Sequence, residues 1–125
     1  MSKRRVVVTG LGIVSPVGNT LATAWDSITN GRSGIGQISH FDTTGYTATI
    51  AGEVRDFDAK AWVNPKDAKK METFIHYGLA ASMMAMDDAG LEITDANAER
   101  AGVLIGSGIG GVRGIEDTAI DLYKG

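Results

Sequence analysis

Two glycine-rich segments have the residue types and spacing that could bind a phosphate. One is Thr9-Gly10-Leu11-Gly12, and the other, at residues 106–111, reads Gly-Ser-Gly-Ile-Gly-Gly. Each follows a short apolar run, and a glycine-rich turn between a strand and a helix can bring backbone N–H groups close to a phosphate. The first segment has Ser15 where the dinucleotide-binding fingerprint needs its third glycine. Residues 106–111 fit the glycine spacing better, so a nucleotide-binding α/β domain using this turn stays open beside a purely structural turn.

A cluster of lysines is the second candidate for binding. Residues 60–70 contain four lysines and a single acid, Asp67, in a chain whose net charge is −3. Lys66, Lys69 and Lys70 stand at positions i, i+3 and i+4, which one helical turn places on the same face. A positive patch on an acidic chain indicates an anionic partner, although such a face can also be merely solvated.

The usual reacting groups are missing or poorly placed. The chain contains no cysteine, and its two histidines, His40 and His76, lie far apart without a neighbouring metal-binding or catalytic motif. Ser107 stands among glycines, but not in the strand–turn–helix motif of a serine nucleophile. We therefore expect no metal and no cofactor, and these residues do not by themselves indicate a reaction.

Apolar runs and capping residues predict the elements that would position these segments. Buried strands are predicted at residues 5–8 and 101–105, with another strand within residues 49–54. Helices are predicted from a cap at Asn19 or Thr20 to Thr29, over residues 112–123, and along a longer stretch that stops at Gly90. Strands alternating with helices are typical of an α/β fold. The longer helix carries one small or apolar stripe, made of Met71, Phe74, Ile75, Gly78, Leu79, Ser82, Met83 and Met86.

Length and composition limit the class of protein. The chain has 125 residues, 43% of them apolar and 22% charged, as in a soluble globular domain. Its mild negative charge argues against nucleic acid as a partner, and no apolar run approaches the roughly 20 residues that cross a membrane. We expect a cytoplasmic protein with neither kind of partner.

Five segments together resemble the β-ketoacyl-acyl-carrier-protein synthases, and in particular the elongating type II class. The resemblance covers essentially the whole chain and implies the N-terminal part of a thiolase-like fold with α-β-α-β-α layers. It also implies a homodimer that performs a decarboxylating Claisen condensation in fatty acid biosynthesis, with acyl- and malonyl-loaded acyl carrier protein as partner. The segments are RVVVTGLGIVSPVGN (residues 5–19), GRSGI (31–35), HFD (40–42), FIHYG (74–78) and IGSGIGG (105–111).

The same resemblance implies that this chain is incomplete. The family's catalytic cysteine, its two catalytic histidines and its lysine all lie beyond the equivalent of Gly125. We therefore expect residues 1–125 to be an N-terminal segment of the first thiolase-like half, inactive by itself. A non-catalytic module for carrier binding or dimerisation is the other alternative.

Two features carry over residue by residue. Lys66, Lys69 and Lys70 match the basic segment that docks the acidic carrier protein, with Lys69 at a position where the family often has arginine. Ile109 matches the residue that borders the acyl-chain pocket near the dimer interface. The resemblance thus explains the glycines around Ile109 without a phosphate, because small residues let the backbone approach the pocket.

Overall fold

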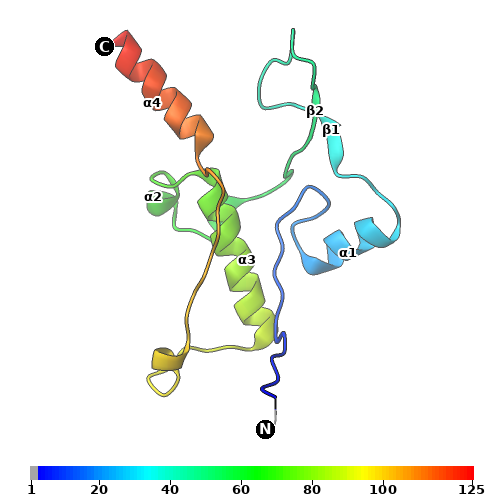
Figure 1. Cartoon of the computed structure of the whole chain (residues 1–125), viewed down its shortest axis with the longest axis vertical. Coiled ribbons are helices and arrows are strands. Elements are labelled where there is room, and N and C mark those ends of the chain that lie inside the picture. Colours follow the sequence, from blue (N-terminus) through cyan, green and yellow to red (C-terminus); the bar gives the residue numbers. More distant parts are fainter. Residues whose placement is uncertain (1–2) are drawn as a thin grey trace.

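The computed structural model describes residues 3–125, with one long helix, Thr73–Ala89 (α3), at its centre. Two extended segments run along α3, one from the N-terminal region and one from residues 101–111 (Figure 1). The last helix in the chain projects away from the N-terminal end of α3. None of the helices in the described part of the chain is both long enough and apolar enough to span a membrane. The other elements are α1 (Leu21–Thr29), β1 (Ile35–Gln37), β2 (Ile50–Gly52), η1 (Ala59–Ala61), α2 (Pro65–Ala68), η2 (Ala98–Arg100) and α4 (Val112–Lys124).

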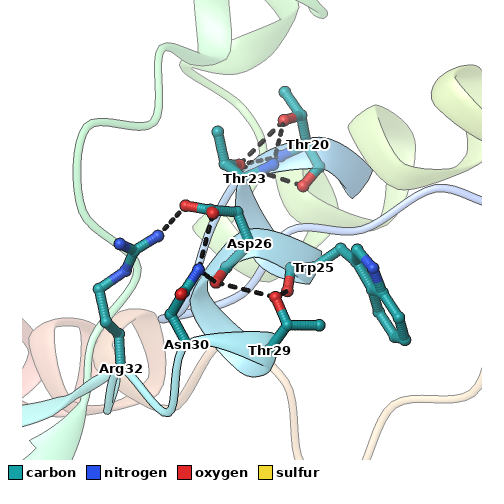
Figure 2. A network of polar contacts seen from close by, with 7 residues as sticks. All are labelled: Thr20, Thr23, Trp25, Asp26, Thr29, Asn30 and Arg32. Carbon is teal, nitrogen blue, oxygen red and sulfur yellow. Dashed lines mark hydrogen bonds and ion pairs between the residues drawn. The ribbon is translucent and has the colours of Figure 1, made fainter.

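Helix α1 begins and ends where its capping residues predict. The Thr20 side chain accepts a hydrogen bond from the Thr23 N–H, and the Thr23 side chain accepts one from the Thr20 N–H, which forms a capping box. Beyond the last turn, the Asn30 amide donates to Asp26 Oδ1 at 2.8 Å, while Arg32 forms an ion pair with Asp26 Oδ2 (Figure 2). These local contacts define both ends of α1 before any tertiary packing is needed.

The glycine pair at residues 10 and 12 lies against α3. A Cβ atom on Gly12 would stand 2.9 Å from the backbone nitrogen of Ala85, and one on Gly10 would stand 2.6 Å from that of Ala89. The Leu11 N–H donates to Asp88 Oδ2 at 2.9 Å. This first glycine segment is therefore a close crossing of backbone over helix, which explains its glycines without a ligand.

The predicted strands at residues 5–8 and 101–105 do not form in this structure. Both segments are extended, but neither has a hydrogen-bonded neighbour within the described chain, and Val6 and Leu104 are 94% and 99% exposed. Their β-branched and apolar residues favour extended backbone, but a strand also needs a partner strand. The prediction of buried strands was wrong for this chain by itself.

One small antiparallel sheet is present in the described residues. The predicted strand within residues 49–54 is confirmed as β2, which pairs with β1 in the register Ile35 to Gly52 and Gln37 to Ile50. Strand β1 was not predicted. Few residues are buried in this open chain, and the apolar ones among residues 3–125 are only Ala24, Val63 and Ala80.

Candidate functional site

The three candidate lysines lie in and directly after α2. The Asn64 side chain caps this short helix by accepting a hydrogen bond from the Lys66 N–H at 2.9 Å, and Pro65 occupies the first turn. Lys69 still has helical backbone, and the Lys70 N–H donates to the Asp67 carbonyl at 2.9 Å. The structure thus brings Lys66, Lys69 and Lys70 together on one turn, and all three are exposed.

A hydrogen bond from His76 connects α3 to the turn that carries Lys66, Lys69 and Lys70, which we call the basic turn. The Nε2 atom of His76 lies 3.1 Å from the carbonyl oxygen of Ala68, and because a carbonyl only accepts, the nitrogen is the donor. The ring is half-buried. His76 therefore has a structural contact.

The second glycine segment lies beside the first turns of α3. A mostly apolar groove of about 430 Å³ separates the two, lined by Phe74, Tyr77, Leu79, Ile105 and Gly106 among others. Ile109 follows on the same turn but does not line this groove, and its side chain is 81% exposed. Its role in an acyl pocket stays a prediction.

The carboxylate of Glu53 is a feature that sequence analysis missed. Its side chain is only 8% exposed and accepts hydrogen bonds from the Ser39 N–H at 2.9 Å, the Ser39 hydroxyl at 2.8 Å and the His40 N–H at 3.3 Å. The Ser39 N–H, followed by the Ser39 hydroxyl, holds the pKa of Glu53 below its ordinary value of 4.5. This carboxylate ties the end of β2 to the loop after β1.

Acidification is expected to weaken the hairpin through this carboxylate. Because the pKa of Glu53 is lower in the folded chain than in the unfolded chain, its stabilisation is complete above an unfolded pKa of about 4.5. The stabilisation is lost as the pH falls through the folded pKa. Unfolding free energies measured from about pH 6 to pH 3 should fall less in Glu53→Gln than in the wild type. Glu99→Gln, at an exposed position, serves as control, and parallel curves for Glu53→Gln and wild type would contradict the assignment.

Among residues 3–125, no three histidine, aspartate or glutamate side chains gather closely enough to hold a metal ion.

Comparison with known proteins identifies the family of this chain. Residues 3–124 match the model of the β-ketoacyl synthase N-terminal domain. The chain belongs to the β-ketoacyl synthase family. The resemblance stated from the sequence motifs is thus confirmed over almost the whole chain.

Relatives of this ketoacyl synthase chain agree on its class. It is 57% identical over 116 residues to 3-oxoacyl-[acyl-carrier-protein] synthase 2 of Vibrio harveyi, covering 93% of this chain and 28% of that protein. It is 48% identical over 126 residues to the protein of the same name from Synechocystis sp., covering 100% of this chain and 30% of that protein. The ketoacyl synthase chain therefore spans less than a third of the length of these relatives.

A solved structure supports the fold of the ketoacyl synthase chain. The ishigamide ketosynthase/chain length factor superimposes with a TM-score of 0.64 at 39% identity, over 73% of this chain and 23% of that one. The predicted α/β, thiolase-like fold class is confirmed by this similarity together with the family match.

Proposed function

We propose that the protein carrying this chain is a fatty-acid-elongating β-ketoacyl-[acyl-carrier-protein] synthase, and that residues 1–125 form an N-terminal segment of its first thiolase-like half. The observation that carries the proposal is the 57% identity, along 93% of the chain, to a protein named 3-oxoacyl-[acyl-carrier-protein] synthase 2. In this proposal the enzyme is a cytoplasmic homodimer.

The proposed reaction joins two thioesters. An acyl group moves from acyl carrier protein to a cysteine thiolate, and malonyl-carrier protein loses carbon dioxide to give a carbanion. The carbanion attacks the acyl carbonyl, forms a carbon–carbon bond and expels the thiolate. Since this chain contains no cysteine, it contributes binding surfaces, and the thiolate comes from another part of the protein.

The basic turn is the surface proposed to receive the carrier protein. Lys66, Lys69 and Lys70 are exposed on one turn that Asn64 caps and His76 fastens to α3. An ordered cluster of cations steers an acidic partner and raises the association rate. The ammonium group of lysine is a point charge and lacks the planar guanidinium with which arginine binds a carboxylate through two hydrogen bonds. Docking here therefore depends on net charge more than on paired hydrogen bonds.

Reversing Lys66, Lys69 and Lys70 to glutamate tests the proposal in the full-length enzyme. The wild-type enzyme should condense acyl- and malonyl-carrier protein to a β-ketoacyl product. The triple reversal should weaken carrier binding and slow association, most strongly at low salt. Each exposed ion pair contributes about 0.2–1 kcal/mol, so the three together should weaken binding by roughly 3- to 150-fold.

Lys3→Glu, Arg4→Glu and Arg5→Glu together provide a matched control, because these three exposed residues change the net charge by the same amount elsewhere. The control should bind carrier protein nearly as well as the wild type. Wild-type enzyme that forms no β-ketoacyl product would contradict the proposed function. Equal losses in both triple variants would contradict only the docking role of the basic turn.

One observation weighs against the nucleotide-binding alternative. The carboxylate of Glu72 lies against Gly111 and Gly114 at the start of α4, which is the position where a phosphate would meet the helix N-terminus. A negative side chain there repels an anionic ligand.

The other alternative, a non-catalytic module for carrier binding or dimerisation, is part of the main proposal. Carrier-binding and dimerisation surfaces are what this chain is proposed to contribute to the enzyme.

A further inference from the structure

The start of α4 has a notch that one side chain from the start of α3 fills. Glu72 immediately precedes α3, and a Cβ atom added to Gly111 would stand 2.5 Å from its Cγ and 2.9 Å from its Cδ. A Cβ atom added to Gly114 would overlap the Glu72 carboxylate oxygen Oε1 and stand 2.9 Å from Cδ. The side chain of Glu72 therefore occupies the space that both glycines leave free.

Gly114 is an unexpected residue at this position. It lies inside α4, where glycine costs about 1 kcal/mol relative to alanine. Its φ is not in the left-handed region, so conformation does not require glycine there. The space taken by the Glu72 carboxylate gives a physical reason for this loss of helix stability.

Phe74 holds the other side of the same turn. A Cβ atom on Gly110 would stand 2.8 Å from Cζ at the tip of the Phe74 ring, and Gly110 has a φ of +74°. Phe74 also lines the groove that Ile105 and Gly106, at the beginning of the glycine turn, line as well. Phe74 therefore contacts the glycine turn at Gly110, directly after Ile109.

Residues between these contacts have no packing of their own. Apart from the glycine itself and its two chain neighbours, no atom lies within 4 Å of the position that a Cβ would take on Gly106 or on Gly108, and Ile109 is 81% exposed. The contacts nearest to Ile109 are therefore those of Phe74 with Gly110 and of Glu72 with Gly111.

We propose that Glu72 and Phe74 are positioning residues that hold the glycine turn carrying Ile109, and so set the acyl-chain length that the enzyme accepts without touching the acyl chain. This inference rests on the proposed function and on the acyl-pocket role that the family resemblance implies for Ile109. It adds a specificity role for two side chains at the start of α3.

The test measures kcat/KM of the full-length enzyme over a series from short to long acyl-carrier proteins. Glu72→Ala empties the notch, and the ratio of long-chain to short-chain kcat/KM should change by about 10-fold, the usual effect of about one methylene of misfit. Glu72→Gln keeps the shape of the side chain and should restore the wild-type ratio. Phe74→Leu should change the ratio in the same direction as Glu72→Ala.

Gly114→Ala gives the same test without weakening α4. The added methyl group displaces the Glu72 carboxylate from the notch, while alanine is the better helix former. The length ratio should change as in Glu72→Ala, with a melting temperature no lower than that of the wild type. A length effect in a variant of unimpaired stability cannot be ascribed to general unfolding.

Ile109→Phe separates the failure of this inference from the failure of the proposed function. If Ile109→Phe changes the length ratio but Glu72→Ala and Gly114→Ala do not, the positioning role is wrong and the acyl-pocket role of Ile109 stands. If none of the three changes it, both are wrong. Because Glu72 acts through Ile109, the effects of Glu72→Ala and Ile109→Phe should be non-additive in the double variant, and additivity would also overturn the inference.

Discussion

Ile109→Phe in the full-length enzyme is expected to spare short acyl chains and to reduce kcat/KM for long ones by about 10- to 200-fold. Gly108 and Gly110 flank Ile109, so its side chain is the only bulk that this part of the turn can present to a substrate. A buried methylene gains roughly 0.8 kcal/mol only while space remains for it, and a phenylalanine ring would take that space. Steady-state kinetics over a short-to-long acyl series measures the effect.

The control for this prediction is Ile109→Leu, which keeps the volume of the side chain and should leave the length profile nearly unchanged. Thermal unfolding of each variant is measured alongside. If Ile109→Phe lowers activity equally for every chain length and also lowers the melting temperature, Ile109 fills a subunit interface and does not border the acyl pocket.

Gly12→Ala is expected to destabilise the packing of the N-terminal segment on α3 severely. The added methyl group would overlap the carbonyl oxygen of Ala81 and stand 2.9 Å from the backbone nitrogen of Ala85. Helix backbone cannot rotate away as a flexible side chain can, so the segment must separate from α3. Overpacking of this kind costs about 1–3 kcal/mol, which should speed amide hydrogen exchange along α3 by roughly 5- to 150-fold and lower the melting temperature.

Gly102→Ala is the matched control for Gly12→Ala. No atom lies within 4 Å of the position that its Cβ would take, and its φ is not in the left-handed region. Hydrogen exchange along α3 should therefore be unchanged in Gly102→Ala. If both variants behave alike, the close crossing at Gly12 does not contribute to stability.

The helices could be predicted because their signals are local. The Thr20 cap and the turn at Asn30 define α1 within a few residues, and the left-handed Gly90, with a φ of +60°, ends α3 where the sequence indicates. The predicted helix at residues 112–123 is confirmed as α4 (Val112–Lys124). Such signals depend on the backbone near them and require no distant partner.

The strands could not be predicted as well, because a strand depends on its neighbours. Residues 5–8 and 101–105 have strand composition, but no partner strand lies beside them in the described chain. Conversely, β1 has only three residues and includes a glycine, so its pairing with β2 rather than its own sequence makes it a strand.

The candidate site could likewise be predicted only in part from the sequence. The spacing of Lys66, Lys69 and Lys70 indicates one helical face, and the structure brings them together on one turn. Glu53 and Glu72 gave no signal, because a lone glutamate in sequence is usually a solvated charge. Their partners, Ser39 and Gly111, lie 14 and 39 positions away, beyond any local pattern.

The crossing of the N-terminal segment over α3 also affects how the protein is made. Leu11 and Asp88, which share a hydrogen bond, are separated by 77 residues. At about 5–20 residues per second, a ribosome needs roughly 4–15 s to synthesise the chain between them. The apolar residues Val6, Val7 and Val8 thus leave the ribosome well before α3 exists to hold the adjacent glycines. The hydrogen bond from Leu11 to Asp88 can form only after that interval, so the crossing is a late, non-local step of folding.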